Sequence, residues 1–292
     1  PGRVSADTKS YLTIDPGDLL GKAVSMWDPS VGAGTVTHQT LGYLFPLGPY
    51  YWLADTLGLP DWLAQRFLWG TIVFAAATGA WRLARWLGYS SAAALVVGVA
   101  YGFTPYVLSY LARLSVILFP WAALGWLVLF AARSAREPGW RWPARFALVV
   151  AIVGSVNATS LVYVGLAPVL WLVLDASTRR VGWRSAITGA LRIGTLCVGV
   201  SIWWILGLRI QGKYGLPILD YTETYEAIAS SSTPFEILRG LGYWFFYGGD
   251  QVGPWIGPAG PYVSQPLLIV LGALLAGLGL AGLMVRGPGR VA

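Results

Sequence analysis

The chain has 292 residues, of which 56% are hydrophobic and only 11% are charged, and its mean hydropathy is +0.60. A soluble globular domain carries about 25% charged residues, so the composition excludes one and indicates a membrane protein. The net charge is +7, and Cys197 is the single cysteine, so no internal disulfide can form.

The first 62 residues hold a cluster of carboxylates in a chain that is otherwise poor in acids. The string DPGD at 15 to 18 has the marks of a helix start: an N-cap aspartate, a proline at the first helical position and a further early acid. Apolar residues follow at helical spacing as far as Trp27, and the string DP at 28 and 29 predicts the helix end. We therefore expect an interfacial helix in which three acids have structural roles, namely Asp15, Asp18 and Asp28.

Asp7 precedes this helix and has no such structural role. A carboxylate at the edge of a bilayer is costly unless it is paired or functional. Arg3 and Lys9 lie close in the sequence and offer an ion pair. Two interpretations stay open, a catalytic carboxylate and a salt-bridged structural one.

Crossing about 30 Å of hydrocarbon takes roughly 20 apolar residues. Runs of this length predict transmembrane helices at about 64 to 87, 91 to 111, 114 to 132, 186 to 208 and 266 to 285. The apolar segment from 146 to 174 is interrupted by SVNATS and has arginines on both sides, so we expect a hairpin of two short helices that turns near Asn157. This gives about seven crossings, and we expect a further, first helix to precede the abrupt polar start of the chain.

These elements predict one membrane domain over residues 1–292. It comprises a first outer loop (1–62), a transmembrane region (63–208) with the hairpin (146–174), a second outer loop (209–265) and a last transmembrane helix (266–285). With the first loop outside, 12 of the 20 basic residues fall at or near the cytoplasmic side and 11 of the 13 acids fall outside. Because an excess of Lys and Arg marks cytoplasmic loops, the positive charge sets the topology and calls for no nucleic acid.

Polar residues of the two outer loops are further candidates for a site. Glu223 and Glu226 are three residues apart and share a face if they lie on a helix. Either that face is solvated, or one of the two acids reaches the same outer cavity as Asp7. His38 is the only histidine and cannot complete a zinc site, which leaves a structural hydrogen bond or a contact to a sugar or phosphate.

Three strings carry a resemblance to a known family: RVSADTKSYLTIDP at 3 to 16, MWDPSVGAGTVTHQTLGYLFPLGPYYW at 26 to 52, and GSVNAT at 154 to 159. Together they resemble the amino-terminal membrane region of the D-type alpha-(1→3)-arabinofuranosyltransferases of actinobacteria, chiefly mycobacteria, which are very large multidomain proteins. The resemblance covers essentially all 292 residues. It implies an all-α GT-C glycosyltransferase fold with juxtamembrane helices in the first outer loop, a multi-pass location in the plasma membrane with the active site on the periplasmic face, and a fragment of a larger protein.

The resemblance also implies an inverting enzyme that moves D-arabinofuranose from decaprenyl phosphoryl arabinofuranose to the arabinan of arabinogalactan or lipoarabinomannan in cell-wall biosynthesis. GT-C enzymes place a catalytic aspartate early in the first outer loop, and only Asp7 occupies that place, as the general base. Glu223 or Glu226 is then a possible second acid. The cations that we choose for the donor phosphate are Arg209, Lys213 and Lys9, and for the first two a role as interfacial anchors stays open. The candidates for substrate contact are His38 and Asn157.

A metal-binding DxD pair corresponds here to DTK at 7 to 9, with lysine in place of the second acid, so we expect neither a metal nor another cofactor. The expected partners are the lipid-linked donor, the arabinan acceptor and membrane lipids. A transporter or lipid flippase is the alternative from another functional class. It predicts ionisable residues at mid-depth in the transmembrane spans, and Arg192 is the only one well inside a predicted span. A non-catalytic scaffold for outer domains is a third interpretation.

Overall fold

The computed structural model describes residues 2–5, 7, 11–36, 40–111, 113–217, 220, 222, 224–230, 232–242, 246–251 and 253–284. The chain divides into two compact units. Unit 1 comprises residues 1–102 and 112–216, and unit 2 comprises residues 103–111 and 217–292. Strand structure among the described residues is limited to two antiparallel pairs of two-residue strands, so the expected all-α class is confirmed.

Unit 1 begins with short elements that form the first loop. They are α1 (Tyr11–Ile14), α2 (Pro16–Ala23), the pair β1 (Trp27–Asp28) and β2 (Thr35–Val36), the 3-10 turn η1 (Leu41–Tyr43) and α3 (Leu47–Thr56). Helix α2 starts as predicted, because the Asp15 carboxylate accepts the backbone N–H of Asp18 at 2.9 Å. Leu19 and Ala23 are its buried apolar face.

The predicted end of this helix is wrong. Helix α2 stops at Ala23, because the chain then turns into the β1–β2 pair, in which Trp27 lies opposite Val36. Asp28 lies in β1, and its carboxylate accepts hydrogen bonds from the backbone N–H and the hydroxyl of Ser30. This local Asx-type turn lowers the pKa of Asp28 and gives the residue a structural role other than the one predicted.

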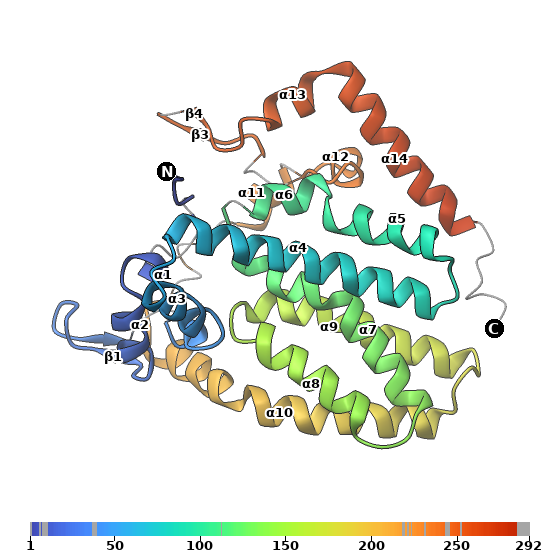
Figure 1. The fold of residues 1–292 in the computed structure, drawn as a ribbon, viewed down its shortest axis with the longest axis horizontal. Helices are drawn as coiled ribbons and strands as arrows, with labels where there is room; N and C mark the ends of the chain where they lie inside the picture. Colours follow the sequence, from blue (N-terminus) through green and yellow to red (C-terminus); the bar gives the residue numbers. More distant parts are fainter. Residues whose placement is uncertain are drawn as a thin grey trace. The chain divides into compact units, whose positions relative to one another are not determined.

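The transmembrane part of unit 1 is built from α4 (Asp61–Trp86), α5 (Ser91–Gly102), η2 (Ser115–Ile117), α7 (Leu118–Arg136), α8 (Arg141–Val153), α9 (Ala158–Ser177) and α10 (Trp183–Tyr214). Helices α4, α8, α9 and α10 all pack on α7, and α10 also lies along α8 (Figure 1). Most side chains of α7 are buried on every side, as expected for a helix that is apolar all round. Helix α7 is thus the centre of the unit.

The expected hairpin turns at residues 154–157, between α8 and α9. Its helices are unequal, since α8 has 13 residues and α9 has 20, and both pack on α7. Among the described residues five segments are long and apolar enough to cross a membrane: Asp61–Trp86, Ser115–Arg136, Ala158–Ser177, Trp183–Tyr214 and Pro266–Met284. The run expected at 91 to 111 is broken at 103 and 104, so the total of seven crossings stays a prediction.

Unit 2 contains α6 (Pro105–Leu111), α11 (Tyr225–Ser230), α12 (Pro234–Leu238), β3 (Gly249–Asp250), β4 (Gly253–Pro254), α13 (Ala259–Ser264) and α14 (Pro266–Met284). Arg239 is buried in this unit and donates to the Tyr262 carbonyl at 2.7 Å, while the Tyr262 hydroxyl donates to the Arg239 carbonyl at 2.9 Å. The pair fixes the end of α12 to α13, next to the start of α14.

Two glycines let α4 and α7 come into backbone contact. A Cβ atom on Gly125 would lie 2.6 Å from the carbonyl carbon of Gly79, and a Cβ on Gly79 would lie 2.7 Å from the Trp126 ring. The Trp126 indole N–H donates to the Ala75 carbonyl at 2.9 Å across the same contact. Small residues at helix crossings are the usual way for membrane helices to approach closely.

We predict that Gly125→Ala destabilises the protein by about 1 to 3 kcal/mol, because the added methyl meets backbone that cannot rotate away. Thermal unfolding in detergent, followed by tryptophan fluorescence, measures the change. Gly199→Ala on α10 is the control, since nothing lies within 4 Å of its added Cβ. Equal melting temperatures for the two variants would contradict the close-contact argument.

Candidate functional site

The segment that carries Asp7 is fixed to the start of α4. The side chain of Gln65, which is only 2% exposed, accepts the backbone N–H of Ser5 at 2.9 Å and donates to its carbonyl at 3.1 Å. Arg66 donates to the Gln65 side-chain oxygen at 2.7 Å and to the Arg3 carbonyl at 3.3 Å. The buried amide thus satisfies both backbone groups of Ser5, and the N–H of Asp7 donates to the same Ser5 carbonyl at 2.8 Å, so the position of Asp7 is defined.

Ser115 binds the Asp7 carboxylate with two donors. Its backbone N–H donates to one carboxylate oxygen at 3.1 Å, and its hydroxyl donates to the other at a shorter distance. Ser115 is 2% exposed and begins η2, directly before α7, whereas Asp7 is half-buried. Because hydrogen bonds to a charged group are the stronger kind, these two contacts orient the carboxylate firmly while leaving part of it accessible.

Two buried tyrosines lie near Asp7. Burial raises the pKa of Tyr43 and of Tyr51, and the negative charge of Asp7 adds to the increase in both cases. Tyr11 stands edge-on to Tyr43, with ring centroids 6.4 Å apart, and burial raises its pKa to about 12. All three phenols are therefore neutral at physiological pH and act as hydrogen-bonding groups or as apolar walls.

A cavity of about 400 Å³ is lined by Leu114 and Val116, the two chain neighbours of Ser115. Its walls come from η1, from the residues on either side of Ser115, from the turn between α8 and α9, and from the carboxyl-terminal third of α10. The lining residues are Met26, Leu41, Gly42, Tyr43, Leu114, Val116, Ile117, Ser155, Val156, Asn157, Ala158, Thr159, Trp204, Gly207, Leu208 and Gln211. Asp7 and Ser115 are not among them, but Tyr43 lies near enough to Asp7 for its pKa to respond to the carboxylate charge.

Close backbone contact brings two walls of this cavity together. A Cβ atom on Gly42 would lie 2.5 Å from the Ser155 carbonyl oxygen, so η1 touches the α8–α9 turn directly. The Ser155 hydroxyl donates to the Phe45 carbonyl at 2.6 Å. At that turn the Asn157 side chain accepts the N–H of Ser160 at 2.9 Å as the N-cap of α9. The first loop and the turn thus form one site.

The other residues proposed from the sequence have different positions. Arg209 and Lys213 lie on the exposed last turns of α10, which extends beyond its expected end, and the helical spacing places them away from the face of Leu208 and Gln211 that lines the cavity. Glu226 is exposed on α11 in unit 2. Three candidates lie outside the described residues, namely Lys9, His38 and Glu223.

The structure brings in residues that sequence reasoning missed. Ser115 and Gln65 belong to no sequence motif. The one sequence signal is that each is a polar residue near the start of a predicted span. Arg113 is a half-buried cation and the chain neighbour of Leu114, which lines the cavity. In the part of the chain that the structure describes, no three His, Cys, Asp or Glu side chains gather as a metal site. Metal independence stays a prediction that a chelator tests.

Comparison with known proteins shows the family of the chain. Residues 1–291 match the family model described as "Alpha-(1->3)-arabinofuranosyltransferase, N-terminal GT-C domain". The chain is 32% identical over 292 residues to an alpha-(1->3)-arabinofuranosyltransferase of Mycolicibacterium smegmatis and 31% identical over 289 residues to one of Mycobacterium tuberculosis. The matches cover 98% and 97% of this chain but 20% of each relative, so the chain spans about a fifth of their length.

A solved structure agrees with the sequence relatives. The cryo-EM structure of the arabinofuranosyltransferase AftD from mycobacteria matches with a TM-score of 0.77 and 28% sequence identity, over 99% of this chain and 20% of that one. A structure of its R1389S mutant matches with a TM-score of 0.78 and 27% identity, over 99% of this chain and 21% of that one. The chain therefore has the GT-C glycosyltransferase fold of a membrane protein and belongs to the family of the amino-terminal GT-C domains of alpha-(1→3)-arabinofuranosyltransferases.

Proposed function

We propose that this chain is the catalytic membrane domain of an arabinofuranosyltransferase and that Asp7 is its general base. The observation that carries the proposal is the carboxylate of Asp7, oriented by two hydrogen bonds from Ser115, whose chain neighbours Leu114 and Val116 line the cavity under the α8–α9 turn. The proposed donor is decaprenyl phosphoryl arabinofuranose, and the proposed acceptor is the arabinan of arabinogalactan or lipoarabinomannan.

The reaction is a single displacement that inverts the anomeric carbon. The acceptor hydroxyl oxygen forms a bond to that carbon, its proton passes to the Asp7 carboxylate, and the bond from the carbon to the phosphate oxygen breaks with its electron pair on the phosphate. Asp7 suits the role because Ser115 holds both carboxylate oxygens in place and the group stays partly accessible. A base within hydrogen-bond reach of the transferred proton is the first requirement of such catalysis.

Arg113 replaces Arg209 and Lys213 as our choice of cation for the donor phosphate. It is the residue before Leu114, which lines the cavity, and two residues before Ser115, which holds Asp7. A guanidinium matches a phosphate with two parallel hydrogen bonds and offsets the charge that develops on the leaving group. The walls of Leu41, Val156 and Trp204 then shield the polyprenyl end from water.

The membrane orientation follows from the positions of the charged residues. Arg82, Arg85, Arg133 and Arg145 gather at one end of the unit 1 helices, and Asp7 and the cavity lie at the other. By the positive-inside rule we assign the arginine end to the cytoplasm and the cavity to the periplasmic face of the plasma membrane.

The transporter alternative loses its single supporting residue. Helix α10 has 32 residues and a length of about 48 Å, well beyond the hydrocarbon thickness. Arg192 donates to the Gly139 carbonyl at 3.4 Å and lies over the Trp140 ring, both in the loop between α7 and α8. Arg192 is therefore at the inner boundary of the bilayer and not at its mid-depth.

The proposal is tested with the full-length protein in detergent or nanodiscs, by transfer of labelled arabinose from the lipid donor to a short synthetic arabinan. We expect labelled product with and without a chelator. A full-length protein that binds donor and acceptor yet forms no product would leave the scaffold interpretation in place. Loss of activity on chelation, restored by a divalent cation, would contradict the expected metal independence.

Ser115→Ala is expected to lower turnover about 10- to 100-fold with little change in the KM for the donor, because it removes one of the two hydrogen bonds that orient the base. Steady-state kinetics of the full-length variant measures both constants. Ser115→Thr keeps a hydroxyl and is the conservative comparison. An increase in KM with unchanged turnover would indicate that Ser115 serves substrate binding and not the orientation of Asp7.

A further inference from the structure

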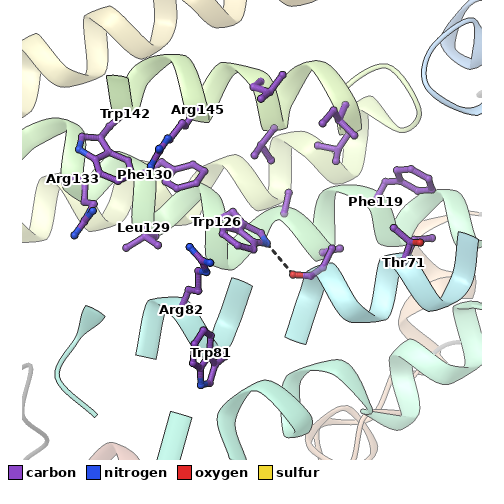
Figure 2. A pocket seen from close by; sticks show the side chains of 18 of the residues that line it. Thr71, Trp81, Arg82, Phe119, Trp126, Leu129, Phe130, Arg133, Trp142 and Arg145 are labelled. Atoms are coloured by element: carbon purple, nitrogen blue, oxygen red, sulfur yellow. Dashed lines mark hydrogen bonds between the residues drawn. The ribbon is translucent and has the colours of Figure 1, made fainter. Parts of the chain in front are cut away.

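A long groove runs along α7 between α4 and α8, away from the Asp7 cavity. It encloses about 880 Å³. Thr71 and Phe119 lie at one end, and Arg82, Arg133 and Arg145 lie at the other (Figure 2). The wall between the two ends is apolar, with Ile72, Leu129 and Val149 among its residues. The groove is therefore apolar along most of its length and cationic at one end only.

The arginine end carries an excess of positive charge. Four guanidinium groups line it, those of Arg82, Arg85, Arg133 and Arg145. Among the described residues Glu137 is the one acid paired with this set, and it lies 3.5 Å from the Nε of Arg133. Asp175, the other acid at this end, is already paired with Arg136 at 2.7 Å. The four lining arginines together with Glu137, which lies outside the lining, have a net charge of +3.

Aromatic rings lie against three of these guanidinium groups. Arg133 and Arg145 lie 4.4 and 4.5 Å from the centre of the Trp142 ring, which is 5% exposed, and Arg82 lies 5.5 Å from the centre of Trp126. The Nε of Arg133 is buried and makes no hydrogen bond in the described structure, although it is within ion-pair distance of Glu137. A stacked guanidinium keeps its edge free for hydrogen bonds, so these groups are placed to receive an anion.

The dimensions of the groove suit an acyl chain. From Phe119 to Arg133 the helix makes fourteen rises of about 1.5 Å, which cover about 21 Å along α7. One leaflet contributes about half of the 30 Å hydrocarbon thickness. A lipid with its headgroup among the arginines therefore has room for one whole chain inside the groove, while its other chain stays in the bilayer.

We propose that this groove, defined by Leu68 to Arg85 of α4, Phe119 to Arg133 of α7 and Trp142 to Val153 of α8, binds an anionic phospholipid of the leaflet at the arginine end, which is the cytoplasmic leaflet in the orientation assigned above. The phosphate accepts hydrogen bonds from Arg82, Arg133 and Arg145, and one acyl chain occupies the apolar part. Basic pockets between transmembrane helices on this side select anionic headgroups by charge. The lipid stabilises the α4–α7–α8 arrangement and takes no part in the transfer reaction.

The test uses the full-length protein in nanodiscs with a phosphatidylglycerol that carries a diazirine on its acyl chain. After irradiation, we expect adducts on peptides of α4, α7 and α8 that line the groove. Unlabelled phosphatidylglycerol should compete, and phosphatidylcholine should not. Arg82→Gln/Arg145→Gln should weaken competition about 10- to 30-fold, because each arginine near an anionic headgroup contributes roughly fivefold in affinity. Leu148→Trp, which fills the groove without a change of charge, should lower labelling as well.

The matched control is Arg180→Gln/Arg184→Gln, which removes two exposed arginines at the same end but outside the groove and should leave labelling unchanged. Three results would overturn the proposal. Equal competition by phosphatidylcholine would show that the groove does not select the lipid by the charge of its headgroup. Stronger competition by a polyprenyl phosphate would show that the groove is a substrate site instead. Cysteine cross-links that join Leu148→Cys to another transmembrane helix of the full-length protein would show that protein fills the groove.

Discussion

Asp7→Asn in the full-length protein is expected to lower the turnover of arabinose transfer by roughly 10²- to 10⁴-fold, the usual contribution of a correctly placed general base. The amide still fills the site and accepts a hydrogen bond from Ser115, but it cannot take the proton of the acceptor hydroxyl. We expect little change in the KM for the donor, because Asp7 acts on the attacking oxygen. Initial rates at saturating donor and acceptor measure the effect.

The matched control for this variant is Asp18→Asn. Asp18 also lies in the first loop, is about half exposed and pairs with Lys22 at 2.8 Å on the surface of α2, where an ion pair contributes little. It should retain full activity. Undiminished turnover in an Asp7→Asn protein that melts at the same temperature as the wild type would overturn the assignment of the base.

Arg136→Gln is expected to produce the largest loss of stability, about 3 kcal/mol. Asp175 is 1% exposed and its carboxylate oxygen lies 2.7 Å from Arg136, so the variant leaves a buried carboxylate without its cation. The value is placed at the low end of the range for buried pairs because the Arg136 side chain is 31% exposed. Thermal unfolding of the purified protein measures the loss.

A double variant separates the pair from the general packing of the helices. Arg136→Leu/Asp175→Leu removes both charges and should recover most of the lost stability, since no charge is then left buried without a partner. Arg180→Gln, on the exposed loop between α9 and α10, should melt like the wild type. A double variant as unstable as Arg136→Gln would show that packing around Trp86 matters more than the ion pair, because Arg136 also lies 5.1 Å from that ring.

The sequence predicted the features that depend on local chemistry. The start of α2 was correct because an N-cap aspartate and a proline at the first position act within one turn. The spans at α4, α7, α10 and α14 were found because about 20 apolar residues in a row have few alternatives to crossing a membrane. The end of α2 was wrong, because the β1–β2 pairing of Trp27 with Val36, a contact between separate segments, set it.

The candidate site divides in the same way. The resemblance pointed to Asp7. No motif marks its partner Ser115, 108 residues later, or Gln65, which binds Ser5. A buried polar pair needs only one serine or one amide at the right depth, and a single residue of that kind makes no recognisable pattern. Arg209 and Lys213 were chosen by their position after a predicted span. Helix α10 continues past that point, and its 3.6-residue period turns both away from the cavity.

The sequence by itself determined that this is a helical membrane protein of the arabinofuranosyltransferase family. Composition, apolar runs and long matching strings are properties of the sequence and need no tertiary structure. The tertiary structure alone decided which polar residues meet. Packing of the neighbouring helices on α7 brings the first loop, η2 and the α8–α9 turn around one cavity, and it lines a second groove with four arginines from three helices. Contacts across such distances follow from helix lengths, crossings and the two glycines at the α4–α7 contact, which no local pattern encodes.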